Sequence, residues 1–214
     1  VGAGLAALTR KRAGESLSLL GPIGNGFDFR AGTQRVLALG GGVGIPPMVF
    51  AARHLRARSD IALTVYMGSE IPFPFELTPA TLAVPGIDSD GRSAVALLQS
   101  WGVASVLASR SGLAGAFDGY VTELAERTLS RLSPQEKSAT LLLACGPEPM
   151  LAAAARLARD HGVACQIALE EYMACGVGGC AGCTVEVHTA AGSAMQRVCV
   201  DGPVFEAAAI YPAA

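Results

Sequence analysis

The sequence lacks several features that would assign the chain to a large class of proteins. Although 51% of its 214 residues are hydrophobic, no apolar run approaches the roughly 18 residues that a membrane-spanning helix needs. Its formal net charge is only −2, and the basic residues gather only briefly, around Arg10–Arg12. Electrostatic attraction to nucleic acid or to an anionic membrane is therefore excluded. We expect its partners to be proteins and small molecules.

The N-terminus also lacks the pattern of a secretory signal. The opening VGAGLAAL is apolar, but the basic residues follow it instead of preceding it, which is the wrong order for such a signal. We therefore expect a soluble, cytoplasmic protein. Because the first residue is Val and not Met, we also expect the chain to be an N-terminally shortened form of a longer protein.

Strand and helix signals alternate along most of the chain. An apolar run at 35–39 is followed by glycines at 40–44, and Pro46 and Pro47 then open a helix-like segment. A second strand is expected at 61–67. Further expected elements are helices over 95–101, 119–132 and 148–161 and strands over 104–108, 139–144 and 163–169. This order predicts an α/β fold with a doubly wound parallel sheet.

The two ends of the chain have a different character. Residues 15–21 (ESLSLLG) alternate polar and apolar side chains, which predicts a half-buried strand at the end of an earlier unit. After residue 169 the sequence becomes rich in glycine and cysteine, with a hairpin expected over 184–188 and 195–198. We expect a separate small domain there.

Four of the six cysteines lie in this last region. Their spacing is Cys175-x4-Cys180-x2-Cys183, followed after fifteen residues by Cys199, which is the plant-type ligand arrangement of a [2Fe-2S] cluster. Four of the nine residues from 175 to 183 are Gly, so the loop can wrap around a cluster and aim N–H groups at its sulfurs. We expect these four cysteines to hold the irons.

A structural zinc site is the alternative for the same cysteines. Such sites commonly use two pairs of cysteines, each about two to four residues apart, and here Cys199 has no near partner. The spacing therefore favours iron and sulfide. Cys165 lies on an expected core strand and is predicted to be a buried apolar residue without a role. None of the three histidines, His54, His161 and His188, has a ligand partner at helical spacing.

Two glycine-containing turns are candidates for nucleotide binding. GGGVGIPP (40–47) offers backbone N–H groups and a helix N-terminus to a pyrophosphate, although it departs from Gly-x-Gly-x-x-Gly and a plain turn is equally compatible. Cys145-Gly146-Pro147 ends a central strand, where open α/β sheets bind ligands; a strand-ending turn is the alternative. Residues 68–70, after the second strand, include no Arg and have none nearby in sequence, which favours NAD over NADP.

These motifs also carry a family resemblance. GPIGNGF (21–27), GGGVGIPP (40–47) and LLACGPEPM (142–150) occur in the order of the ferredoxin reductase superfamily, and the likeness covers nearly the whole chain. The tail is more specific. LEEYMACGVGGCAGC (169–183) and RVCVDGPVF (197–205) are similar to the electron-transfer subunits of the class 1B dihydroorotate dehydrogenases.

The resemblance implies an electron-transfer function. In such subunits NADH gives a hydride to FAD, the flavin separates the electron pair, and the cluster passes single electrons to FMN in a catalytic partner subunit. That partner oxidises dihydroorotate in pyrimidine biosynthesis, within a heterotetramer. By motif, Gly41, Gly42 and Gly44 would face the nucleotide, and Cys145, Gly146 and Pro147 would lie beside nicotinamide and flavin. No catalytic acid or base is expected, because electron relay depends on position and redox tuning.

The resemblance also divides the chain into three expected domains. Residues 1–33 would be the C-terminal part of an FAD-binding barrel, 34–169 an NAD-binding Rossmann-like domain and 170–214 the [2Fe-2S] domain. VGAGLAAL, with Gly2 and Gly4, resembles a flavin-contacting Val-Gly-x-Gly-Thr segment, but Leu5 replaces the Thr and removes a hydroxyl donor. The barrel's Arg-Pro-x-Ser motif is absent. We therefore expect FAD binding in the intact, longer protein.

Two other functions are compatible with the same motifs. Small reductase subunits of other NAD(P)H-linked iron–sulfur flavoenzymes share the VCVDGP tail, but they tend to have Asp at the first ligand position, where this chain has Cys175. An alternative from a different functional class is a non-catalytic interaction module whose structure is stabilised by a bound zinc ion. A visible absorption spectrum separates it from the other two, because zinc gives no charge-transfer bands.

Overall fold

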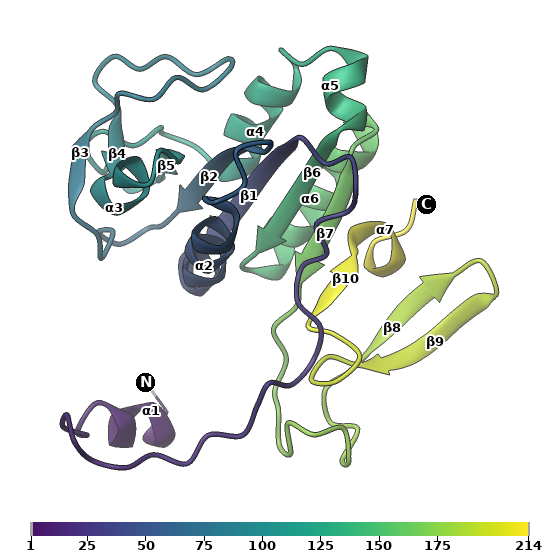
Figure 1. The fold of residues 1–214 in the computed structure, drawn as a ribbon. Helices are drawn as coiled ribbons and strands as arrows, with labels where there is room; N and C mark the ends of the chain where they lie inside the picture. Colours follow the sequence, from purple (N-terminus) through teal and green to yellow (C-terminus); the bar gives the residue numbers. More distant parts are fainter. Residues whose placement is uncertain (1, 214) are drawn as a thin grey trace.

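A six-stranded sheet forms the centre of the computed structural model, which describes residues 2–213 (Figure 1). The strand order is β10-β7-β6-β1-β2-β5. The five strands from β7 to β5 are parallel, and β10 runs antiparallel to β7 at one edge. The strands are β1 (Arg35–Gly41), β2 (Ala62–Gly68), β5 (Ala104–Ala108), β6 (Thr140–Cys145), β7 (Ala164–Ala168) and β10 (Val204–Glu206). The predicted α/β fold with a parallel sheet is confirmed.

Helices cover both faces of this sheet (Figure 1). Alternate residues of β1 divide between the two cores: Leu37 and Leu39 pack towards one face, Val36 and Ala38 towards the other. On the first face the sheet buries α4 (Val121–Leu129) and α6 (Glu148–His161). On the second it buries α2 (Ile45–Leu55) and α3 (Ala96–Ser100). The central strands are therefore apolar on both sides, as their continuous apolar runs predict.

The remaining elements are short. A 3₁₀ turn, η1, lies between β1 and α2, and a second small sheet joins β3 to β4. Near the C-terminus, β8 and β9 form the expected hairpin. These elements and the other short helices are η1 (Gly42–Gly44), β3 (Leu77–Pro79), β4 (Ser93–Val95), β8 (Thr184–Thr189), β9 (Gly192–Arg197), α1 (Ala3–Leu8), α5 (Pro134–Ser138) and α7 (Ala207–Ile210). Among residues 2–213, each helix is too short or too polar to cross a bilayer.

The strand expected over 15–21 is wrong. These residues lie in an extended arm that leads from α1 to the sheet (Figure 1). Leu19 and Leu20 are 91% and 76% exposed, and within residues 2–213 no strand pairs with them. Alternating polar and apolar side chains indicate which face of a strand would be buried. A strand forms, however, only where a neighbouring strand pairs with its backbone hydrogen-bonding groups.

The second half of the arm is fixed to the body of the protein. Asn25 donates hydrogen bonds from its side-chain amide to the carbonyl oxygens of Val200 (3.3 Å) and Asp201 (3.0 Å). The backbone N–H of Asp28 donates to the Gln166 side chain at 2.9 Å. Gly24 has φ +78°, and a Cβ there would overlap the carbonyl oxygen of Gly202. The GPIGNGF motif thus packs against the segment that follows Cys199.

The C-terminal region returns to the main sheet after the cysteine loop. The hairpin of β8 and β9 has its own small core, formed with Cys183, Val198 and Phe205. β10 then pairs with β7, with Val204 opposite Ala168. The expected boundaries at residues 33/34 and 169/170 stay a prediction.

Candidate functional site

The loop between β7 and β8 carries three of the four clustered cysteines, and Cys199 follows β9. All six cysteines are free thiols. Two glycines in the loop, Gly176 and Gly178, have positive φ values of +67° and +79°. This backbone conformation is costly for residues with a side chain, so the glycines let the loop fold back on itself around the cysteines.

The four thiols form two pairs. Cys175 lies beside Cys180, and Cys183 lies beside Cys199. The pairs differ in exposure: Cys183 and Cys199 are 3% and 4% exposed, whereas Cys175 is half-buried and Cys180 exposed. The result is one inner and one outer pair of sulfurs.

Backbone N–H groups point at several of these sulfurs. Val177 donates to the sulfur of Cys175 (3.5 Å), Gly182 to that of Cys180 (3.4 Å) and Cys199 to that of Cys183 (3.5 Å). The N–H of Val177, followed by contributions from Cys180 and Gly179, lowers the pKa of Cys175 to about 6. Such hydrogen bonds favour the thiolate, which is the form that binds metal.

In the inner pair, the protonated thiol is favoured over the thiolate. Burial, followed by the neighbouring Cys183 thiol, raises the pKa of Cys199. Two adjacent buried thiols resist ionisation unless a positive charge compensates them. Ferric ions supply such a charge, so the donor set fits an iron–sulfur cluster. Within residues 2–213, no three His, Cys, Asp or Glu side chains are grouped as around one ion.

Arg197 and Asp201 hold the segment that carries Cys199. The Asp201 carboxylate accepts from the backbone N–H of Arg197 (2.8 Å) and from its guanidinium (3.0 and 3.2 Å). The guanidinium also donates to the carbonyl oxygen of Gly178 in the cysteine loop at 3.1 Å. Both residues belong to the RVCVDGPVF motif (197–205) noted in the sequence, but their positioning role was not predicted from it.

The two nucleotide-binding candidates meet at the carboxyl edge of the sheet. Gly40 pairs with Cys145 in the ladder between β1 and β6. A Cβ on Gly44 would overlap the carbonyl oxygen of Cys145, and a Cβ on Gly41 would lie 2.6 Å from the sulfur of Met150. Gly41 and Gly44 therefore have a packing role: they let the loop lie against the Cys145-Gly146-Pro147 turn.

The tip of the glycine loop is open. Gly42 has φ +54°, and a Cβ there would meet no atom within 4 Å. Gly42 and the next residue, Val43, are exposed. At the start of α2, Gly44 provides no side-chain cap. Pro46 and Pro47 have no N–H, and the N–H of Ile45 donates to the Gly42 carbonyl. The N–H groups that could receive an anion such as a pyrophosphate are therefore those of the exposed loop tip, at Gly42 and Val43.

Cys145 is a neutral thiol at the end of β6. Burial, followed by the nearby Glu170 carboxylate, raises its pKa. The thiol therefore stays protonated near neutral pH, which suits an uncharged surface beside a ring system and not a nucleophile.

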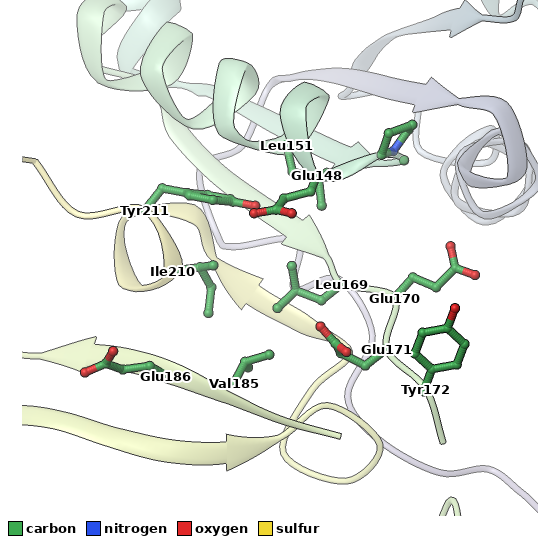
Figure 2. A pocket seen from close by; sticks show the side chains of 12 residues that line it. Glu148, Leu151, Leu169, Glu170, Glu171, Tyr172, Val185, Glu186, Ile210 and Tyr211 are labelled. Carbon is green, nitrogen blue, oxygen red and sulfur yellow. The ribbon is translucent and has the colours of Figure 1, made fainter. Parts of the chain in front are cut away.

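A cavity of about 690 Å³ lies between this turn and the C-terminal hairpin (Figure 2). It begins at Gly146 and Pro147, and its far side includes Ile210 and Tyr211. Four carboxylates line it, from Glu148, Glu170, Glu171 and Glu186. Negative side chains repel phosphate, so the pyrophosphate candidate remains the glycine loop.

The structure does not bring all the predicted site residues together. Gly41, Gly42, Gly44 and the Cys145–Pro147 turn share one edge of the sheet, and the four cysteines share one loop region. Gly2 and Gly4 lie at α1, far from both (Figure 1), and a Cβ on either would meet nothing within 4 Å. The flavin assignment of these two glycines therefore rests on sequence resemblance alone.

Residues 68–70 have no Arg nearby in sequence, but the fold brings Arg110 to Glu70. β5 lies beside β2, and the residue two positions after it is Arg110. Its backbone N–H donates to the Glu70 carboxylate at 3.2 Å. The sheet thus brings together two residues that are forty positions apart in sequence.

Comparison with solved structures places the fold. A structure of the NADH-dependent reduced ferredoxin-NADP oxidoreductase, from work on flavin-based electron bifurcation, matches 98% of this chain and 66% of its own with a TM-score of 0.70 and 25% identity. The fold and the cysteine loop together define a ferredoxin reductase-like electron-transfer protein.

Curated relatives give the particular family. The chain is 33% identical to the electron transfer subunit of dihydroorotate dehydrogenase B (NAD(+)) from Caldanaerobacter subterraneus subsp. tengcongensis, covering 95% of this chain and 70% of the relative. The same subunit from Geobacillus sp. strain WCH70 is 33% identical, with 96% and 69% covered. The iron–sulfur cluster binding domain of dihydroorotate dehydrogenase B matches residues 170–211. The chain belongs to the family of dihydroorotate dehydrogenase B electron transfer subunits, which confirms the resemblance seen in the sequence.

Proposed function

We propose that this chain passes electrons between a nicotinamide dinucleotide and a [2Fe-2S] cluster, and onwards to a catalytic dihydroorotate dehydrogenase subunit. The observation that carries the proposal is the arrangement of four thiols in two pairs inside the segment that matches the family's iron–sulfur domain. When bound, the cluster supplies one-electron chemistry.

Cys175, Cys180, Cys183 and Cys199 are the proposed ligands. The inner pair, Cys183 and Cys199, anchors the site in the small core of the hairpin, and the outer pair faces solvent. The N–H groups aimed at the sulfurs reduce the cost of gathering negative charge in the loop. Arg197 fixes the positions of Cys199 and the cysteine loop relative to each other, through its hydrogen bonds to Asp201 and to the Gly178 carbonyl.

The dinucleotide is proposed to bind along the carboxyl edge of the sheet. The open tip at Gly42 would receive the pyrophosphate, with Gly41 and Gly44 allowing the loop to approach the Cys145-Gly146-Pro147 turn. This turn would then lie beside the nicotinamide and the flavin, with the neutral Cys145 thiol adding no charge. The relatives' names specify NAD(+), and NAD is the dinucleotide proposed on that basis.

FAD belongs to the proposal through the family. Gly2 and Gly4 are its proposed contacts in this chain, at the end of a barrel whose final part would be residues 1–33. Because α1 lies away from β6, the strand that ends at Cys145 (Figure 1), we derive no step of the electron path through this segment. Residues 34–169 are the proposed nucleotide domain and residues 170–214 the proposed cluster domain.

The proposed partner is an FMN-containing catalytic subunit in the cytoplasm, joined with this chain in a heterotetramer. The name "electron transfer subunit" carried by the relatives supports such a partner. Mixing this chain with a catalytic subunit of this kind should give NAD-linked oxidation of dihydroorotate. Failure to form any complex would leave the cluster assignment but remove the proposed partner.

The cluster is tested by spectroscopy and metal analysis. The purified protein should contain about two irons and two acid-labile sulfides per chain, with visible absorption that bleaches on adding dithionite. Zinc without sulfide would instead support the interaction-module alternative. The ferredoxin-NADP oxidoreductase match favours a second candidate, a reductase subunit of another NAD(P)H-linked flavoenzyme; a cluster without orotate chemistry in any complex would support it.

A further inference from the structure

The Cys199 turn, residues 197–202, directs its N–H groups inward. Three successive N–H groups, at residues 200–202, donate to the Arg197 carbonyl at 3.2, 2.8 and 3.3 Å. Several N–H groups thus share one acceptor, and the carbonyl oxygens of the same residues need other donors. These donors come from the arm that precedes β1.

Asn25 of the arm donates hydrogen bonds to three of these carbonyls. Its side-chain amide donates to Val200 (3.3 Å) and to Asp201 (3.0 Å). Its backbone N–H donates to Gly202, and the backbone of Asn25 also forms an isolated parallel bridge with Pro203. One residue of the arm therefore satisfies three successive acceptors of the Cys199 turn.

Gly24 brings the arm close enough for these hydrogen bonds. It has φ +78°, and a Cβ there would lie 2.8 Å from the carbonyl oxygen of Cys199 and would overlap that of Gly202. Only glycine combines this backbone conformation with so close an approach. The arm thus packs directly against the backbone of a proposed cluster ligand.

A second contact anchors the arm at the other end of the iron–sulfur segment. Gln166 lies on β7, the strand before the cysteine loop, and is 2% exposed. Its side chain accepts from the backbone N–H of Asp28 (2.9 Å) and donates to the Asp28 carbonyl (3.2 Å). The arm is therefore fixed both where the segment leaves the sheet and where it returns.

Gly24 and Asn25 do not contribute to a hydrophobic core. Both residues are exposed, and within residues 2–213 neither belongs to one of the three cores. Substitutions at these positions should therefore leave the sheet folded. Their effect should fall on the Cys199 turn.

We propose that Gly24 and Asn25 are positioning residues for the [2Fe-2S] cluster, because they fix the Cys199 turn, and with it one ligand of the inner pair, on the arm. The inference rests on the proposed function, which takes Cys199 as a ligand. Residues 1–33 are the proposed end of the flavin barrel, so the same contacts join that unit to the cluster domain. Supporting contacts affect how firmly ligands hold a metal, and the surrounding charges and hydrogen bonds set the potential of a cluster.

The first test compares Asn25→Ala with Gln99→Ala. Asn25→Ala should release iron to a chelator on the order of 10-fold faster than the unmodified chain. Gln99 is the matched control, because its side-chain amide also connects two backbone groups, at Thr81 (2.9 Å) and Pro79 (3.3 Å). It lies on α3, beside β5, at the opposite edge of the sheet from β10 (Figure 1). Gln99→Ala should keep the iron as the unmodified chain does.

Gly24→Ala and Gly32→Ala form a second matched pair within the arm. Gly24 and Gly32 both have positive φ, +78° and +87°, so the two variants carry a similar backbone cost. A Cβ on Gly32 meets nothing within 4 Å, whereas a Cβ on Gly24 would displace the Cys199 turn. Only Gly24→Ala should accelerate iron release. Far-UV circular dichroism checks that both variants are folded.

Spectroscopy of the cluster separates positioning from a general loss of stability. The dithionite-reduced cluster of Asn25→Ala should give an EPR spectrum with shifted g values, because Cys199 is held differently. Asn25→Asp keeps the shape of the side chain but places a negative charge beside the turn, which should lower the reduction potential. Gln99→Glu makes the same change of charge far from the cysteines and should leave the potential as it is.

The outcomes distinguish this inference from the proposed function. If Asn25→Ala and Gln99→Ala release iron equally fast, the positioning role is wrong and the cluster assignment stands. Faster release with an unchanged EPR spectrum and an unchanged potential in Asn25→Asp would also overturn it, because lower stability alone would then explain the result. Absence of iron and labile sulfide from the unmodified chain would contradict the proposed function itself.

Discussion

Arg197 and Asp201 lie on either side of Cys199, and the Asp201 carboxylate accepts hydrogen bonds from both the backbone and the guanidinium of Arg197. The same guanidinium reaches the Gly178 carbonyl in the cysteine loop. One side chain therefore connects the two segments that supply the four thiols. We infer that it positions the proposed ligands without being one.

Replacing Arg197 by Ala should weaken retention of the cluster. Loss of such a supporting contact lowers metal affinity by on the order of 10-fold or more. Iron and labile sulfide per chain, followed during incubation with a chelator, measure the effect. Arg58→Ala is the control, since it breaks another Arg–Asp pair, with Asp60 at 2.7 Å, far from the cysteines. Equal rates of iron loss in both variants would contradict the positioning role.

Cys180→Ser should abolish the cluster, because a hydroxyl replaces one of the four proposed thiolate ligands. Cys165→Ser provides the comparison: Cys165 is 6% exposed on β7 and burial raises its pKa. The second variant should keep its visible spectrum and lose only about 1–3 kcal/mol of stability, the cost of an unpaired buried hydroxyl. Visible spectra and thermal unfolding of the two variants test these expectations. Loss of the visible absorption in both variants would refute the ligand assignment.

Gly44→Ala should destabilise the nucleotide domain by about 1–3 kcal/mol. The φ and ψ of Gly44, −80° and −6°, suit any residue, so the cost comes from overlap with the Cys145 carbonyl. Gly26→Ala is the matched change, because a Cβ there meets nothing within 4 Å. In urea unfolding, the midpoint concentration should fall for Gly44→Ala and stay almost unchanged for Gly26→Ala.

Tyr66 should make stability fall at high pH. Burial raises its pKa to about 12, above the value of about 10 in an unfolded chain. The stabilisation is therefore complete below pH 10 and is lost as pH rises towards 12, by roughly 2–3 kcal/mol. Tyr66→Phe removes a hydrogen bond to the Thr128 hydroxyl of 2.7 Å, costing about 0.5–1.5 kcal/mol near neutral pH, and should flatten the curve. Unfolding free energies at pH 8, 10 and 11 test this, and parallel curves would rule it out.

The elements that sequence predicted best are those whose signals are local. Leu37 and Leu39 stand in a continuous apolar run that only a strand buried on both faces accommodates, and the glycines after it mark the turn. The cysteine spacing predicted a shared site for the same reason, since three of the four sulfurs come from one short loop.

The features that sequence missed depend on long-range neighbours. Residues 15–21 have a strand pattern, but the pattern contains no information about the partner strand, and Leu19 remains exposed. Arg110 was overlooked because its proximity to Glu70 follows from β5 lying beside β2. Strand order is decided by the packing of the whole sheet, and no local pattern encodes it.

The antiparallel pairing of β10 with β7 has a consequence for the evolution and the thermal unfolding of this chain. Ala168 and Val204 are ladder partners, so the iron-binding segment leaves and rejoins the sheet at adjacent points. A segment whose two ends lie side by side can be inserted, replaced or removed with little disturbance of the domain that carries it. Its small core is distinct from the two cores of the sheet. Demetallation should therefore release this module at a lower temperature and leave the sheet to unfold in a second, iron-independent transition, which differential scanning calorimetry would resolve.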